Sequence, residues 1–250
     1  MRSDAQARVA GAATLVAALC VVEALIRAGV INRFVVPLPS QILAAIPRIV
    51  DEEHVLARFG QTSLEVMWAS VLLVAIGIPL GVLLHRFRIA RAAFETWVGA
   101  LAAAPLVLMY PLFLVLFGRS TTTIVMIGFA AGLAPVILKT LEGLVSTREV
   151  LLDVGRSFRL SPRQQFSKIL LPAALPAVFV GMRLALIFAM INIVGVEFLI
   201  NFGGLGQLVN ELAERYDLPG MYAAILFVVA ISVVFYDLTA RLERWLRPNA

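Results

Sequence analysis

The sequence has little of what most metal-binding and catalytic sites are built from. Its 250 residues include one cysteine and two histidines. A single cysteine excludes an intramolecular disulfide framework and a cysteine-based zinc cluster. The histidines, His54 and His85, fall in different segments, which argues against a histidine metal site or catalytic dyad. We therefore expect this chain to bind no metal or cofactor of its own.

Lysine is also scarce, and this bears on ATP chemistry. A phosphate-binding loop of ATPases ends in Gly-Lys-Ser/Thr, whereas Lys139 and Lys168, the only lysines, each follow another residue type. The chain is therefore predicted not to be an ATP-hydrolysing enzyme. Gly203-Gly204-Leu205-Gly206 is glycine-rich but follows no predicted strand. We interpret it as a turn or gate element.

Charged residues make up only 15% of the chain, against 61% hydrophobic residues, and the mean hydropathy is +0.93. Soluble domains are about 25% charged and about 45–50% apolar. The apolar excess must face lipid, which argues against a soluble enzyme, a nucleic-acid-binding module and a disordered regulator. The net charge of +5 is by itself compatible with a nucleic-acid partner, so the positions of the cations decide its meaning.

What the chain does have is a series of long apolar segments. A membrane-spanning helix needs about 20 consecutive apolar residues. The windows 66–84, 96–118, 120–138 and 218–236 contain no charged residue. The windows 9–28 and 174–200 each contain two charged residues. The sequence predicts an all-α polytopic membrane protein with six transmembrane helices in a single domain, 1–250. A cleaved signal peptide is the alternative for the first window, but no convincing cleavage site closes it.

The cations indicate an orientation. With the N-terminus inside, 14 of the 21 lysines and arginines fall in inner segments and six in outer ones, with Arg183 inside a span. Inner segments of membrane proteins are enriched in cations. We therefore predict a multi-pass protein of the bacterial inner membrane with both termini in the cytoplasm. The +5 charge is then a feature of a lipid-facing chain, and no nucleic-acid partner is expected.

The inner segment 139–173 is the most polar long stretch. Its apolar residues recur at helical spacing, at Val150, Leu151, Val154 and Phe158 and then at Phe166, Ile169 and Leu170. This pattern predicts two short amphipathic helices, the second capped by Ser161 with Pro162 at its first position. Such helices either lie on the bilayer surface or dock in a groove of a soluble partner. Composition alone favours the surface interpretation.

The same segment carries a specific spacing. It reads Asp153-Val154-Gly155-Arg156-Ser157-Phe158-Arg159, then nine residues, then Ile169-Leu170-Leu171-Pro172. This resembles the EAA loop of ABC importer permeases, Glu-Ala-Ala-x3-Gly-x9-Ile-x-Leu-Pro, with the spacing kept in full. The chemistry is kept in part, since Asp153 replaces Glu and Arg159 replaces the loop glycine. An arginine there is unfavourable if the position needs a positive φ.

Further segments look like permeases of the nitrate/sulfonate/taurine group, and the resemblance covers roughly residues 37–245. They are Leu38-Pro39-Ser40, Gly77-Ile78-Pro79-Leu80-Gly81, Leu171-Pro172-Ala173-Ala174-Leu175-Pro176, Gly181-Met182-Arg183-Leu184-Ala185-Leu186, Val194-Gly195-Val196-Glu197-Phe198 and Gly204-Leu205-Gly206. The resemblance implies a type I permease core over 62–245 with a cytoplasmic two-helix coupling loop over 139–173.

The resemblance also implies partners. Two permease subunits, commonly a homodimer, form the pathway for a small solute, here of a nitrate-, sulfonate- or taurine-like kind. Two ABC ATPase subunits, which carry ATP and Mg²⁺, dock on the coupling loops, and an outer substrate-binding protein delivers the solute. The ATPase-coupling residues implied for this chain are Asp153, Val154, Gly155, Arg156, Ser157, Phe158, Arg159 and Leu160.

Polar residues inside spans are candidates for the translocation pathway, because a charge at the bilayer centre costs about 2.5–3.5 kcal/mol. Arg183 either attracts an anion or lies at the membrane interface. Asn192 is expected to line the same face as Arg183. Glu197 either lines the pathway or, as we favour, positions the outer loop.

Two other classes compete with an ABC permease. A six-helix secondary transporter or channel needs more intramembrane ionisable groups than these, and leaves the inner loop without a purpose. An intramembrane enzyme needs a cluster of His, Cys or carboxylates at membrane depth, and the sequence shows none.

Overall fold

The structure, a computed structural model, describes residues 2–246, and the regular elements in that range are all helical. They are α1 (Arg2–Arg27), α2 (Pro39–Asp51), α3 (Val55–Leu72), α4 (Ile78–Arg86), α5 (Arg88–Ala103), α6 (Tyr110–Phe117), α7 (Thr121–Val145), α8 (Glu149–Ser157), α9 (Pro162–Gln165), α10 (Leu171–Ile200), α11 (Gly204–Glu214) and α12 (Leu218–Leu246). Two π-turns, Leu73–Gly77 and Phe166–Leu170, and one 3-10 turn, Leu106–Met109, connect some of them. The predicted all-α class is confirmed.

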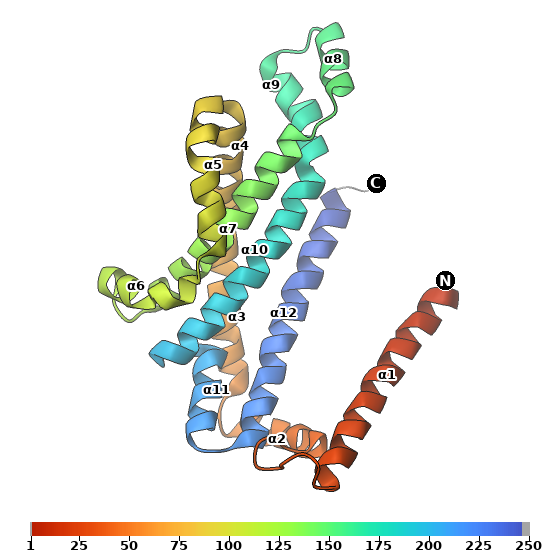
Figure 1. Cartoon of the computed structure of the whole chain (residues 1–250), viewed down its shortest axis with the longest axis vertical. Helices are drawn as coiled ribbons and strands as arrows, with labels where there is room; N and C mark the ends of the chain where they lie inside the picture. The colour runs from red at the N-terminus through yellow and green to blue at the C-terminus, as the bar shows by residue number, and fades with distance from the viewer. Residues whose placement is uncertain (1, 247–250) are drawn as a thin grey trace.

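Helices α7 and α10 lie side by side at the centre of the bundle, with α3 and α12 next to them (Figure 1). The side chains of Ile124 and Ile127 on α7 and of Ile193 and Val196 on α10 are fully buried in one cluster, together with Leu205 of α11. Both helices are covered by neighbours, whereas α12 keeps most of its apolar side chains on the surface. That surface is suited to lipid.

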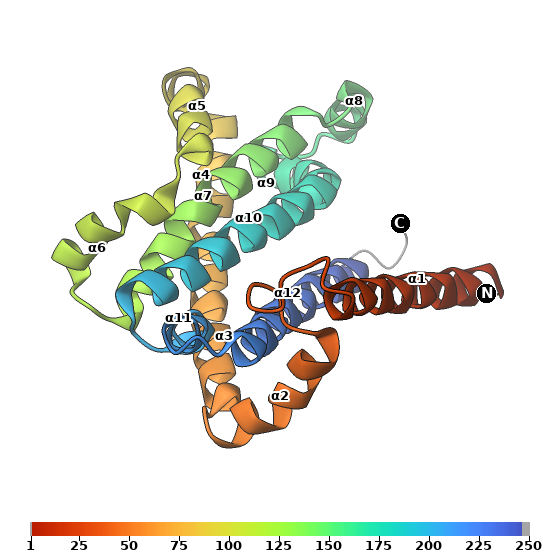
Figure 2. The same cartoon turned by 60° about the horizontal axis from the view of Figure 1, so that its bottom comes forward.

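Four helical runs in the described residues are long and apolar enough to cross a membrane: Val55–Arg86, Thr121–Val145, Pro162–Ile200 and Leu218–Trp245. They contain the predicted windows 66–84, 174–200 and 218–236 and all but the first residue of the window 120–138. A fifth span results if the bent pair α5 and α6 is taken as one, so the prediction of six spans is not confirmed. Helix α1 is continuous over 26 residues and projects away from the bundle (Figure 2).

The window 96–118 is not the single straight helix that its composition predicted. Helices α5 and α6 meet at 92°. The break lies at Ala104, whose ψ of 133° is extended. Ala104 precedes Pro105, and a residue before proline is disfavoured in the α region. Proline also lacks the N–H that a continuing helix needs, so the apolar run turns aside at this point.

Each π-turn ends two residues before a proline, at Pro79 and at Pro172. A proline ring clashes with the carbonyl four residues earlier, which belongs to Ala75 or Lys168, both inside the π-turns. The wider turn keeps each helix continuous, so Pro162–Ile200 is one run of 39 residues. The second amphipathic helix predicted in the inner loop is therefore not separate: it forms the first turns of the run that contains α10.

The two ends of the bundle are distinct. Helices α8 and α9 lie at one end and α2 and α11 at the other (Figure 1). We call these the α8 end (residues 149–165) and the α11 end (residues 37–65 and 197–220).

Candidate functional site

Helix α8 carries the EAA-like residues and exposes an apolar ridge. Val150, Val154 and Phe158 are 69%, 46% and 77% exposed, and their spacing of four places them on one helix face. Arg156 donates to Asp153 over 2.7 Å, and both side chains are open to solvent. Within the part of the chain that the structure describes, this ridge remains on the surface.

The opposite face of α8 is packed. A Cβ on Gly155 would lie 2.6 Å from Cδ1 of Ile169, so no larger residue fits without a shift. The Gln165 amide donates to the carbonyl of Leu152 over 3.1 Å. Helix α8 is thus held by one face against the run that leads into α10, and it presents the other.

The turn after α8 explains the glycine of the EAA pattern. Arg159 has a φ of 52°, and the N–H of Leu160 donates to the carbonyl of Gly155 over 3.0 Å, the bond that closes a helix in a Schellman motif. A non-glycine residue in this left-handed conformation is strained by roughly 1–2 kcal/mol. Ser161 and Gln164 then form a reciprocal capping box, which confirms the predicted cap with Pro162 at the first helical position.

At the α11 end, the amides of Gly203, which immediately precedes α11, and of the first three residues of α11 all donate to side chains. Gly203 donates to Gln207, Gly204 to Gln61 (3.2 Å), Leu205 to Thr62 (2.9 Å) and Gly206 to Glu197 (2.7 Å). A helix normally leaves these groups unsatisfied. Here they are unavailable to a phosphate, which agrees with the interpretation of the glycine-rich segment as a structural element.

Glycine is required in this segment for two reasons. Gly204 has a φ of +74°, and a Cβ there would fall 2.0 Å from Oε1 of Glu197. A Cβ on Gly206 would fall 2.2 Å from the carbonyl oxygen of Val194. The backbone of α11 therefore sits directly on α10.

Glu65 belongs to this cluster and was missed by sequence reasoning. Its side chain is fully buried beside that of Glu197, and it accepts a 3.4 Å hydrogen bond from Gln61. The available signal was the single acid of α3, one residue before the window 66–84. Counting only uncharged windows placed Glu65 outside the span that holds it.

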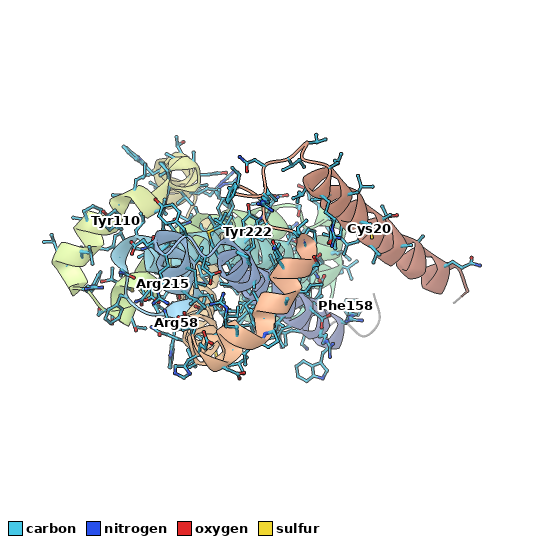
Figure 3. All side chains as sticks on the ribbon, turned by 90° about the horizontal axis from the view of Figure 1, so that it is seen from below. Cys20, Arg58, Tyr110, Phe158, Arg215 and Tyr222 are labelled. Carbon is cyan, nitrogen blue, oxygen red and sulfur yellow. The ribbon has the colours of Figure 1, made fainter. Side chains whose placement is uncertain are left out.

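Three ion pairs join separate elements at the α11 end. Arg58 bonds Glu211 over 2.8 Å, Arg215 bonds Glu53 over 2.7 Å, and Arg48 bonds Asp217. The last hydrogen bond raises the pKa of the Arg48 guanidinium. In the view from below, Arg58 and Arg215 are labelled on the same side of the molecule (Figure 3). These pairs tie α3 directly to α11, and they tie α2 and the loop after it to the turn between α11 and α12.

The predicted pathway residues do not form one site. The Arg183 guanidinium pairs with Glu243 on α12, lies 5.6 Å from the ring centre of Tyr236 and lines a cavity of 160 Å³. Asn192 is buried and donates to the carbonyl of Phe188 on its own helix over 2.8 Å. Nine residues amount to two and a half turns of a helix, so Arg183 and Asn192 lie on opposite sides of α10. Glu197 accepts hydrogen bonds from Thr62 and from the Gly206 amide at the start of α11.

The chain matches the model of a known protein family. Residues 74–248 match the family model described as binding-protein-dependent transport system inner membrane component. The chain belongs to this family.

Relatives carry names of the same kind. A probable ABC transporter permease protein of Brucella melitensis is 29% identical over 167 residues, which are 67% of this chain and 68% of the relative. The glycine betaine/proline betaine permease ProW of Escherichia coli is 28% identical over 72% of this chain and 50% of its own length. The choline permease OpuBD of Bacillus subtilis is 26% identical over 78% of this chain and 86% of its own length.

A solved structure shares the fold. An inward-facing form of the MetNI methionine ABC transporter superposes with a TM-score of 0.64 at 20% identity, covering 77% of this permease and 95% of the matched chain.

These findings confirm the predicted ABC importer permease, a multi-pass inner-membrane protein that works with a separate ATPase and a substrate-binding protein. A secondary transporter or channel is not favoured. The finer nitrate, sulfonate or taurine grouping is not supported, because ProW and OpuBD are named for betaines and choline.

Proposed function

We propose that α8 is the segment through which this permease receives the work of its ATPase partner. The observation that carries the proposal is the exposed ridge of Val150, Val154 and Phe158 on a helix whose other face is packed. Burying such a ridge in a groove is favourable by about 25 cal/mol per Å² of apolar surface, and Asp153 and Arg156 supply charged contacts at its edge. The segment from Asp153 to Leu160 then moves with the ATPase surface.

The wider assembly follows from this role. Two copies of the permease form the pathway, two ATPases bind ATP and Mg²⁺ beneath them, and residues 62–245 form the transport core. Both termini and the α8 end face the cytoplasm, and the α11 end faces the binding protein. In this arrangement α1 and the bent pair of α5 and α6 complete six membrane-crossing elements.

We propose that the solute is a small quaternary ammonium compound of the betaine or choline class, on the strength of the names of ProW and OpuBD. The pairing of Arg183 with Glu243 supports this choice, because the arginine charge is balanced and offers little attraction to an anion. Uptake of choline and glycine betaine by proteoliposomes containing the complete transporter, with taurine as the comparison, tests it. Uptake of taurine alone overturns it.

Co-purification with the ATPase tests the coupling role. Phe158→Ala removes the most exposed aromatic of the ridge, and loss of a central interface aromatic typically costs about 2 kcal/mol, or roughly 30-fold in affinity. We expect ATPase recovery to fall while the permease still inserts in the membrane. Phe34→Ala is the matched control, since Phe34 is 76% exposed and lies outside the α8 end. Undiminished recovery with Phe158→Ala contradicts the assignment.

A further inference from the structure

The buried carboxyls of Glu65 and Glu197 raise a question that ATPase docking does not answer. Each is fully excluded from solvent, and they come from helices α3 and α10. Thr62 donates to Glu197 over 2.7 Å and precedes Glu65 by three residues, so it shares a helix face with Glu65 and places the two carboxyls in one buried cluster. Two neighbouring negative charges in a buried site repel each other strongly. No arginine, lysine or histidine among the described residues forms an ion pair with either of them.

The hydrogen bonds around the pair are unequal. Both oxygens of Glu197 are occupied by donors: Oε1 accepts from the Thr62 hydroxyl over 2.7 Å and Oε2 from the Gly206 amide over 2.7 Å. Glu197 is therefore suited to carry a negative charge at the positive end of α11.

Glu65 is in the opposite situation. Its Oε1 accepts one long bond of 3.4 Å from Gln61, and its Oε2 is buried with no partner. Leaving a buried carboxylate oxygen without a donor is unfavourable. A proton on Glu65 removes the charge and turns the unpartnered oxygen into a donor toward the neighbouring carboxylate.

The other polar groups that face the pair do not replace this proton. On α3, Thr62 donates to Glu197 and Gln61 to Glu65, and Arg58 is already paired with Glu211 of α11. Thr121 of α7 is placed to donate to Glu65, but Oε2 of Glu65 has no partner at hydrogen-bond geometry among the described residues. Arg119, which precedes α7, donates to the carbonyl of Asn201.

We propose that Glu65 and Glu197 share one proton and form a proton-dependent latch that fixes α11 to α3 and α10. Glu65 is the protonated donor and Glu197 the charged acceptor that holds the first turn of α11. Removing the proton places two charges in the buried site and releases α11. Both are positioning residues for the α11 end of the transporter, and the proposal is independent of the docking of α8.

The matched variants Glu65→Gln and Glu197→Gln test the assignment of roles. An amide at position 65 keeps a donor toward Glu197 without needing a proton, so the purified full-length permease in detergent should unfold at a temperature close to that of the wild type. An amide at position 197 removes the charge and turns one acceptor into a donor that faces the N–H of Gly206 or the hydroxyl of Thr62. That variant should unfold at a clearly lower temperature, and the reverse order overturns the proposal.

Hydrogen exchange across pH provides a readout that a merely structural role does not move. The exchange rates of the Gly204–Gly206 amides, corrected for intrinsic pH dependence, should rise steeply in the wild type as pH is raised, by up to about tenfold per pH unit when one proton is released. They should stay flat in Glu65→Gln. Infrared spectra of the wild type at neutral pH should show a protonated buried carboxyl that is missing in Glu65→Gln and retained in the control Glu211→Gln.

A bound cation is the competing explanation, and the same preparation excludes or reveals it. If sodium or potassium, added alone, raises the unfolding temperature of the wild type but not of Glu65→Gln, and no protonated carboxyl is seen, the shared proton is wrong. A flat exchange profile in the wild type overturns the proposal as well.

Discussion

At the α11 end, most polar groups find their partners within the chain: the first amides of α11, the hydroxyl of Thr62 and three ion pairs are satisfied, and Oε2 of Glu65 is the exception among the buried side-chain atoms that the structure describes there. At the α8 end, one helix face is left apolar and exposed, and its ion pair of Arg156 and Asp153 lies in solvent. The difference teaches where this permease is complete and where it needs another polypeptide. Three predictions test the contrast.

Gly206→Ala should have the largest effect. The new Cβ meets backbone atoms, the carbonyl oxygen of Val194 at 2.2 Å and the amide nitrogen of Phe198 at 2.9 Å, which cannot move aside as a flexible side chain can. We expect a loss of about 3 kcal/mol in unfolding free energy, measured by denaturation of the purified permease. Gly60→Ala, where no atom lies within 4 Å, is the control and should be neutral or slightly stabilising. Equal stability of Gly206→Ala and wild type contradicts the close packing of α11.

An intermediate effect should separate the two kinds of ion pair. Arg58→Ala breaks a pair whose side chains are 23% and 19% exposed and which joins α3 to α11, and we expect a loss of about 1–2 kcal/mol. Arg156→Ala breaks a pair whose side chains are 71% and 64% exposed, and its loss should stay below about 0.5 kcal/mol. Double-mutant cycles with Glu211→Ala and Asp153→Ala measure the two coupling energies. Equal coupling energies would show that the ends do not differ in this respect.

The smallest expected effect is a gain. Arg159→Gly places a residue without a Cβ at the φ of 52° that closes α8, and relief of strain should stabilise this turn by about 1 kcal/mol. Hydrogen exchange at the Leu160 amide should slow, because its bond to Gly155 is retained for longer. The Gly206 amide, at the far end, is the internal control and should be unchanged. Faster exchange at Leu160 is the contrary result.

The sequence predicted most where apolar runs or fixed spacings carry the information. Four uncharged or nearly uncharged windows are helices because lipid-facing segments need little else, and the EAA spacing located α8 although Arg159 departs from the family pattern. Window 96–118 failed because Pro105 turns the chain without changing its hydropathy. The contacts of Gln61 and Thr62 with the start of α11 and with Glu197 stayed hidden because they join residues more than 130 positions apart, and no local pattern reports such distances.

The unbroken run Pro162–Ile200 has a mechanical consequence. At 1.5 Å per residue its 39 residues form a rod of roughly 58 Å. Gln165 and Ile169 near its first end touch α8, and Glu197 near its last end holds α11. The same continuous helix therefore contacts α8 near its first residue and α11 near its last. A rigid displacement of its α8 end is transmitted to its α11 end with no loop between the two contacts.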